Sequence, residues 1–507
     1  MKRSLRQSMS GLHTWSGLLL GWLLFAITLS GTATVFRSEI SGWMRPEVTA
    51  VAPPAKAIEA AVGWLARAHP KAAGWYLAAP DDRLATVQAV FDDPAAPAGY
   101  RDIALDPSTG SPDAMRATLG GEFLYRFHFE LQLPYPWGRI LASAAAMLML
   151  IALISGIIIH ARIFKDVFTL RPGKGKRSWL DAHNVLGVLA LPFHLMITAT
   201  GIVTLLTLTM PWAAMANYGQ DLARTFAEQS PGLVSRPAAG TPETLAPIGP
   251  MLAEAERRFA GGRIGRVSIA NPADANSVVT VANHDGDQLA YRQSTVSFDG
   301  GSGRVMGAYA ESRPAQQTYA VLYGLHMGRF APWVSRWLYF GCGLALAGTI
   351  ATGLVLWLQA RQGAAGPGHM LVARLNIGTI AGLPIAMLAL LWGNRLLPFG
   401  LAGREGAEVS VFFWAWGAAI LFGFLRPVRR AWIELFWVAA AGAALLPFAS
   451  FALTGRGLWV AILGGDRLFW GFDLMLFALA ALFAAIARKI AAHRAPAPRR
   501  RRTPAPA

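Results

Sequence analysis

Apolar runs long enough to cross a bilayer alternate along this chain with two long polar stretches. A helix that crosses about 30 Å of hydrocarbon needs roughly 20 mainly apolar residues. Runs of this kind occur at 13–36, 138–161, 184–208, 334–358, 371–394, 409–426, 431–453 and 468–488. The pattern therefore predicts a polytopic α-helical membrane protein with about eight spans.

The two polar stretches, residues 37–136 and 209–332, each combine a helical pattern with strand patterns. The helical periodicity covers 55–68 in the first stretch and 245–259 in the second. Short alternating runs, broken by turn residues, then predict strands. These strands are expected at 84–91, 267–269, 278–281 and 288–291. We therefore expect two small α+β domains outside the membrane.

Composition and charge give the predicted spans an orientation. Of 507 residues, 54% are hydrophobic and 15% are charged, which is too apolar a balance for a soluble protein. The net charge of +17 falls mainly beside the apolar runs, so we expect no nucleic-acid partner. The basic loop at 161–180 and the basic tail after 488 are predicted to be cytoplasmic, because positive residues stay on the inner side. Both termini are then cytoplasmic and both polar stretches lie outside.

These patterns divide the chain into consecutive parts. The parts are a first span (1–36), an outer domain (37–136), the second and third spans with the basic loop (137–208), another outer domain (209–332), a fourth span (333–360), four further spans (361–490) and a basic tail (491–507). The tail is rich in Pro, Arg and Ala and has no apolar periodicity, so it is predicted to be disordered.

The first four spans form an internal repeat. The first and third spans each begin with a His-x-x-x-Gly motif, and another glycine follows eighteen residues after each histidine. The matching positions are His13 and His183, Gly17 and Gly187, and Gly31 and Gly201. A Tyr-x-x-His motif precedes the second span and the fourth, and each of these spans carries a small hydroxyl residue followed by glycine. These positions are His128 and His326, Ser155-Gly156 and Thr352-Gly353. Residues 1–360 thus hold two copies of one unit: helix, outer domain, helix.

Histidine is the residue type on which redox chemistry could depend here. A histidine in a membrane span is costly and usually functional, and a neutral imidazole is a good axial ligand of haem iron. The single cysteine, Cys342, lies in an apolar run, which excludes c-type haem attachment and cysteine-ligated clusters. Candidate ligands are His13, His128, His160, His183, His194 and His326. The other histidines, His69, His284, His369 and His493, are expected to be solvated.

The repeat and the helical spacing suggest how the candidates pair. His13 and His183 occupy equivalent positions at the cytoplasmic ends of spans, so we expect them to bind an inner haem. His194 lies eleven residues after His183, which is about 16 Å along a straight helix and on nearly the same face. We expect His194 to bind an outer haem together with His326 or His128, with proton transfer as its alternative role. His160 is a further candidate, either as an inner ligand or as a hydrogen-bond partner of a haem propionate.

A structural role is the alternative for several of these side chains. Histidines at span ends can anchor to lipid headgroups or cap a helix, which applies to His13, His128, His160 and His326. Arg139 and Arg336 are expected to be interfacial anchors, with propionate binding as their alternative. The sequence contains no Walker A run, dinucleotide fingerprint, HExxH or nucleophile elbow, so no catalytic residue is assigned.

The His13, His183, His128 and His326 motifs, with their glycines, resemble the PepSY-associated transmembrane family over about residues 8–360. The outer domains resemble PepSY modules. Relatives of similar plan include di-haem siderophore reductases in the inner membranes of Gram-negative bacteria. The resemblance implies two b-type haems and reduction of a ferric siderophore in the periplasm, with release of Fe(II). Because no flavin or nicotinamide motif is present, a quinol or a cytoplasmic reductase would be the electron donor.

Two other functions are consistent with the same sequence. PepSY modules are also linked with envelope regulation, so the protein could be a non-catalytic sensor that presents its outer domains to a partner. A permease for the siderophore or for freed iron would use the last four spans. Those spans hold no histidine, and their few acidic candidates are Glu434, Asp466 and Asp473.

Overall fold

The computed structural model describes residues 4–96, 98–160, 170–229, 232–291, 294–361 and 366–493. The chain forms two compact units, the first made of residues 1–363 and 397–406, the second of residues 364–396 and 407–507. Part of the predicted basic loop, 161–169, and nearly all of the predicted tail, 494–507, lie outside the described residues.

Long apolar helices occur in both units. Among the described residues, seven helical segments are long and apolar enough to cross a membrane, and eight if one bent pair counts as a span. The seven are Gly21–Trp43, Trp137–Ile159, Trp333–Gln359, Pro367–Leu396, Arg404–Leu425, Val428–Thr454 and Arg467–Ala492, and the bent pair is Lys176–Leu189 with Leu191–Thr204. The prediction of a polytopic helical membrane protein is confirmed.

The first helix of each repeat copy is broken at the same place. In the first copy, α1 (Leu5–Leu19) and α2 (Gly21–Ala33) meet at Leu20, seven residues after His13. In the second, α7 (Lys176–Leu189) and α8 (Leu191–Thr204) meet at Ala190, seven residues after His183, with a bend of 67°. Pro192 lies in the first turn of α8, where its missing N–H frees a backbone carbonyl of the preceding helix.

The helices of the two copies interlock. In each copy the first helix packs on the long second helix, so α1 contacts α6 (Trp137–Ile159) and α7 contacts α14 (Trp333–Gln359). A short helix precedes each long one, and α5 (Gly121–Glu130) packs on α2 as α13 (Pro314–Met327) packs on α8. Contacts between copies, α2 with α14 and α6 with α8, surround a core of Leu24, Ala145, Met149 and Leu346.

Shorter helices complete the helical part of the first unit. They are the 3-10 turn η1 (Thr34–Phe36), α3 (Arg37–Trp43), α9 (Leu206–Thr209), α10 (Trp212–Tyr218) and α11 (Leu222–Gln229). η1 and α3 continue α2 into the first polar stretch (37–136). α9, α10 and α11 follow α8 and lead into the second polar stretch (209–332).

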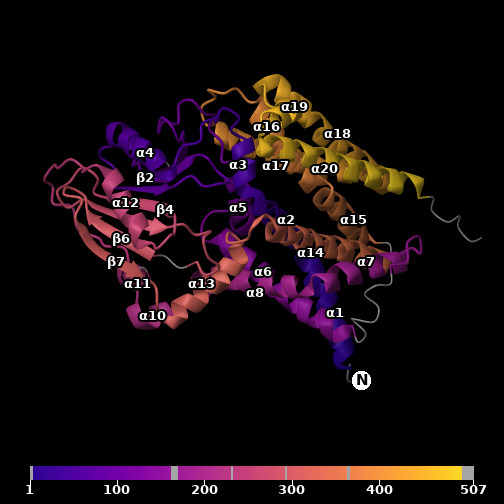
Figure 1. The fold of residues 1–507 in the computed structure, drawn as a ribbon. Coiled ribbons are helices and arrows are strands. Elements are labelled where there is room, and N and C mark those ends of the chain that lie inside the picture. Colours follow the sequence, from indigo (N-terminus) through magenta and orange to yellow (C-terminus); the bar gives the residue numbers. More distant parts are fainter. Residues whose placement is uncertain are drawn as a thin grey trace, which may run out of the picture. The chain divides into compact units, whose positions relative to one another are not determined.

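The two predicted outer domains share one antiparallel sheet of seven strands, in the order β3-β2-β1-β4-β5-β6-β7 (Figure 1). Its strands are β1 (Gly74–Ala78), β2 (Val87–Asp92), β3 (Tyr100–Leu105), β4 (Ile264–Ala270), β5 (Val278–Asn283), β6 (Ser294–Asp299) and β7 (Val305–Ala310). The helices α4 (Pro54–Ala68) and α12 (Ile248–Arg258) bury their apolar faces in one core with these strands. We call this region the sheet domain.

The two α+β segments expected from the sequence are present, and their strands join in one sheet. β1 of the first segment pairs with β4 of the second, with Trp75 opposite Ile269 and Leu77 opposite Val267. All four side chains are buried, so separate domains would each expose an apolar sheet edge, and pairing removes both edges.

The elements of this domain match the predicted pattern unevenly. Both helices and the strands predicted at 84–91, 267–269 and 278–281 are present, with shifted ends. The strand predicted at 288–291 was wrong, because this segment is an irregular turn whose Tyr291 joins a polar cluster instead. β1, β3, β6 and β7 were not predicted.

The described residues of the second unit contain helices and no strand. The helices are α15 (Pro367–Ile380), α16 (Gly382–Leu396), α17 (Arg404–Leu425, from residue 407 on), α18 (Val428–Thr454), α19 (Leu458–Leu463) and α20 (Arg467–Ala492). Of the acidic residues considered for a permease, Glu434 pairs with Arg426, Asp466 pairs with Arg456, and Asp473 is buried.

Candidate functional site

The structure brings four histidines of the repeat together as two pairs, each with one ring from each copy. The ring centroids of His13 and His183 are 6.2 Å apart, and we call these residues the basic-end pair, because α7 begins at Lys176 and Arg177. The ring centroids of His128 and His326 are also 6.2 Å apart, and we call them the sheet-side pair. The proximity expected for His13 and His183 is observed.

Each ring of the basic-end pair is held by the backbone of the adjacent long helix. The Nδ1–H of His13 donates to the carbonyl of Ala152 at 2.8 Å, and that of His183 donates to the carbonyl of Thr349 at 2.9 Å. Ala152 and Thr349 each lie three residues before the matched hydroxyl positions of the repeat. Since a carbonyl can only accept, Nδ1 carries the hydrogen in both rings, and Nε2 keeps its lone pair.

The rings of the sheet-side pair are also held by the backbone of a neighbouring helix. Here the rings are on the short helices α5 and α13, and the accepting carbonyls are on α2 and α8. The Nδ1–H of His128 donates to the carbonyl of Ile27 at 2.7 Å, and that of His326 donates to the carbonyl of Ile197 at 3.1 Å. Thr200 Oγ1 lies 3.2 Å from Nδ1 of His326. Metal-bound histidines usually donate their second ring N–H to a backbone carbonyl or a carboxylate in this way, which fixes the tautomer and the ring plane.

Glycine faces all four rings. A Cβ at Gly31 would lie 2.6 Å from the His128 ring, and one at Gly201 would lie 2.9 Å from the His326 ring. At the other pair, a Cβ at Gly156 or Gly353 would lie 3.2 Å from the ring of His13 or His183. The glycines therefore recur because the imidazoles occupy the space that a side chain would take.

The donor set and spacing fit a haem group between each pair. An imidazole nitrogen binds a metal at about 2 Å. The 6.2 Å between ring centroids therefore leaves room for one metal atom between the two rings of each pair. Among the described residues, no three His, Cys, Asp or Glu side chains are grouped as ligands of a bare metal ion. Two ligands per site suit a metal whose other positions are filled by a macrocycle.

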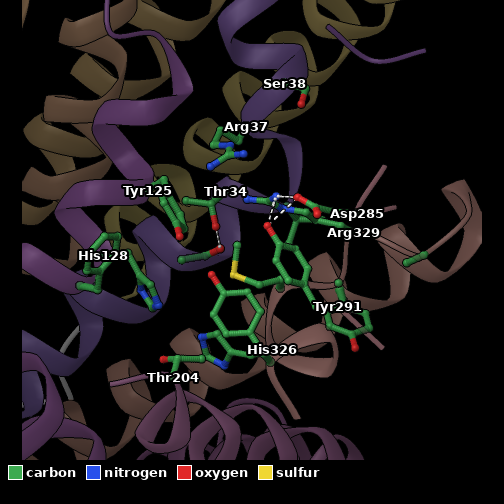
Figure 2. Close-up of a pocket in the computed structure, with 18 of the residues that line it drawn as sticks. Thr34, Arg37, Ser38, Tyr125, His128, Thr204, Asp285, Tyr291, His326 and Arg329 are labelled. Atoms are coloured by element: carbon green, nitrogen blue, oxygen red, sulfur yellow. Dashed lines mark hydrogen bonds and ion pairs between the residues drawn. The ribbon is translucent and has the colours of Figure 1, made fainter. Parts of the chain in front are cut away.

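A cavity of about 980 Å³ extends from the sheet-side pair to the sheet domain. Figure 2 shows His128 and His326 in it, together with Tyr125, Arg37 and Arg329. Its arginines are Arg37, Arg83, Arg139, Arg263, Arg266, Arg329 and Arg336, and its acidic residues are Asp81, Asp82, Asp102, Glu122 and Asp285. Cations outnumber anions along this wall, which favours an anionic ligand.

Asp285 is at the centre of a polar cluster on the sheet-domain side of the cavity. Arg266 and Arg329 donate to its two carboxylate oxygens at 2.6 and 2.9 Å. The hydroxyl of Tyr291 donates to the same carboxylate at 2.5 Å and accepts from both guanidinium groups at 3.1 Å. Burial raises the pKa of Tyr291 to about 12, so this hydroxyl stays protonated and the cluster stays ordered.

A second polar contact joins the two outer segments. His284 lies 3.3 Å from Asp81, and its hydrogen bond with Asp81 raises the pKa of His284 despite partial burial. Burial tends to raise the pKa of Asp81, but hydrogen bonds from His284 and from two backbone N–H groups hold it at about 2. The expectation that His284 is a solvated surface residue was wrong, because its ring is mostly buried in this contact.

The structure does not bring His194 into the outer pair expected for it. His128 and His326 pair with each other. The His194 ring is on α8 and is completely buried. Neither of its ring nitrogens makes a hydrogen bond to the described residues, although the backbones of Gly187 and Cys342 lie nearby. The 67° bend at Ala190 is the reason, because the predicted alignment of His183 and His194 assumed a straight helix.

The other predicted side chains lie apart from the two ring pairs. His160 ends α6, and its Nε2 has no hydrogen-bond partner in the described part of the chain. Arg139 pairs with Glu130, and Arg336 pairs with Glu39 at 3.2 Å, while both arginines line the cavity.

Sequence reasoning did not find the carbonyl partners of the rings or the Asp285 cluster. The recurrence of Ser155-Gly156 and Thr352-Gly353 was a usable signal for the carbonyl partners. It marks the helix turns whose carbonyls accept hydrogen bonds from His13 and His183.

An uncharacterized protein of Pseudomonas aeruginosa, PA4219, is 27% identical over 358 residues, which cover 66% of this chain and 88% of that protein. The sequence profile of the family described as PepSY-associated TM region matches residues 10–360, a range that includes both histidine pairs and the sheet domain. The chain belongs to the PepSY-associated TM region family.

Proposed function

We propose that this protein is a haem-containing oxidoreductase of the bacterial inner membrane, which carries electrons across the bilayer and reduces a ferric siderophore on the periplasmic side. One observation carries the proposal: two histidine pairs, related by the repeat, each have a ring spacing of 6.2 Å and a hydrogen-bonded Nδ1–H. That combination suits bis-imidazole ligation at two levels of one membrane protein.

The distribution of basic residues supports the direction of transfer. Arg171, Lys174, Lys176 and Arg177 precede or begin α7, close in sequence to His183. Under the positive-inside rule this end is cytoplasmic, which makes the sheet domain and the sheet-side pair periplasmic. The electron donor, a quinol or a cytoplasmic reductase, would then act at the basic-end pair.

The chain's own residues bind and orient two b-type haems in this proposal. Four Nδ1–H groups are tied to carbonyls, so each ring presents a neutral Nε2 at a fixed angle. His183 and Ile197, the carbonyl partner of His326, are fourteen residues apart, which is at most about 21 Å along α7 and α8. Haem in these positions would supply one-electron transfer.

The cavity beside the sheet-side pair is the proposed substrate site. Its volume suits a small-molecule ligand, and its excess of arginine suits an anionic one. Hydroxamate and catecholate siderophores hold Fe(III) through hard oxygen ligands and hold Fe(II) far more weakly. One electron delivered here would therefore weaken the binding of iron and release it. No bond within the siderophore would have to break.

The purified full-length protein provides the test. We expect its dithionite-reduced absorption spectrum to be that of a bis-histidine haem and to return to the oxidised form when a ferric siderophore is added. His128→Ala should abolish this reoxidation, whereas the matched control His69→Ala, in the sheet domain, should leave it intact. Protein that purifies without haem, or reduced protein that ferric siderophores do not reoxidise, would contradict the proposal and favour a non-catalytic envelope sensor.

A further inference from the structure

Unlike the four paired histidines, His194 has no equivalent histidine in the other copy of the repeat. It lies eleven residues after His183, and the equivalent residue of the first copy, eleven after His13, is Leu24. Leu24 is buried in the apolar core with Ala145, Met149 and Leu346. The scaffold therefore accepts an aliphatic side chain at this position, and the imidazole of His194 is not needed for the repeat to fold.

The His194 ring is buried without the partners that a structural histidine normally has. Its exposed fraction is 0%, and neither nitrogen is hydrogen-bonded within the described residues. An unpaired polar group in an apolar environment is unfavourable, so such a side chain in a membrane span points to a function.

The surrounding helices supply no unpaired acidic side chain that could hold a proton on this ring. α8 packs against α6, α7, α9, α13 and α14. The one acidic residue on these helices is Asp181 on α7, and its carboxylate pairs with Arg171 at 2.8 Å. The other titratable and charged groups are Arg139 on α6, Lys176, Arg177 and His183 on α7, Tyr319, Tyr323 and His326 on α13, and Arg336, Tyr339 and Cys342 on α14. No neighbouring carboxylate therefore fixes the charge of His194.

The position of His194 connects it with the sheet-side pair. Ile197, whose carbonyl accepts from His326, and Thr198 lie three and four residues further along α8, on the same face as His194. Phe193, Ile197 and Thr198 all line the cavity. His194 therefore lies behind the cavity wall, one helical turn from the residue that orients a proposed ligand.

We propose that His194 takes up one proton when the sheet-side site is reduced by one electron. The inference rests on the proposed function. Haem held by His128 and His326 would supply the one-electron change, and a nitrogen of His194 would bind one proton from water. On reoxidation the electron would pass to the ferric substrate and the proton would return to water. In a low-dielectric layer, the added negative charge is offset by the positive charge on the imidazolium. Reduction of this site then depends on pH.

Potentiometric titration of the full-length protein between about pH 5 and pH 9 tests this coupling. The relevant haem is the one that His128→Ala removes. Over part of this range, its midpoint potential should fall by about 59 mV per pH unit, the limit for one proton per electron. In His194→Leu, which restores the residue of the first copy, the slope should vanish while both haems remain bound.

His194→Gln is the second variant, since it keeps a polar side chain but does not titrate in this range. It should bind both haems and show the same flat profile. A flat profile in the unmodified protein, an unchanged slope in both variants, or loss of a haem from both would overturn the proposal, the last because His194 would then be a ligand. Absence of haem from the unmodified protein would instead refute the proposed function.

Discussion

The contact between Gly31 and His128 allows a quantitative prediction. A Cβ at residue 31 would lie 2.6 Å from two atoms of the His128 ring, whereas ordinary contacts begin at 3.4 Å. In Gly31→Ala the ring must therefore move by about 0.8 Å. His128 cannot move freely, because its Nδ1 is bonded to the carbonyl of Ile27, on the same helix as Gly31, at 2.7 Å.

The expected cost combines two terms. Overpacking of a tight contact costs about 1 to 3 kcal/mol, and weakening a hydrogen bond costs about 0.5 to 1.5 kcal/mol. A total of about 2 to 4 kcal/mol corresponds to a loss of roughly 30- to 700-fold in haem affinity at the sheet-side pair. Haem content per chain, measured by absorbance after purification, should fall toward half.

Two other glycines give a graded control. Gly17→Ala adds a Cβ with no neighbour within 4 Å, so both haems should be retained. Gly156→Ala adds a Cβ 3.2 Å from the His13 ring, so it should weaken binding at the basic-end pair less than Gly31→Ala weakens it at the other. Equal haem content in Gly31→Ala and Gly17→Ala would refute the reasoning.

The sheet domain provides two further predictions. The pKa of His284 is raised and that of Asp81 is lowered to about 2, so their contact stabilises the fold most between about pH 4 and pH 6.5. This stabilisation is lost as pH rises above 6.5 and through the raised pKa of His284. The difference in melting temperature between the unmodified protein and His284→Asn should therefore shrink over that rise; a constant difference would argue against the contact. Trp75→Ala should destabilise the sheet domain by about 3 to 5 kcal/mol in urea unfolding, because Trp75 is 1% exposed in the core. Tyr76→Ala, on the opposite face and 55% exposed, is its control, and similar effects of the two would contradict the assigned register.

The repeat predicted one histidine pair and could have predicted the other. Equivalent residues of two copies meet near a shared axis, which is why His13 approaches His183. The same argument applies to His128 and His326, but their motifs lie in segments assigned outside the membrane. The short helices that carry them instead pack on α2 and α8, a long-range contact that hydropathy does not reveal.

Two other features were not predicted because they depend on tertiary structure. The pairing of β1 with β4 joins strands that are separated in the chain by the whole of the second and third spans. Strand patterns contain no information on which edges meet. The expected alignment of His194 with His183 came from treating residues 184–208 as one straight helix. Pro192 was visible in the sequence, and it predicts a break.

Haem stoichiometry in single alanine variants tests the central claim most directly. The unmodified full-length protein should bind two haems. His13→Ala and His183→Ala should lose the same haem, His128→Ala and His326→Ala should lose the other, and His194→Ala should lose neither. Loss of the same haem from His194→Ala and His326→Ala, with retention of both by His128→Ala, would contradict the two pairs described here.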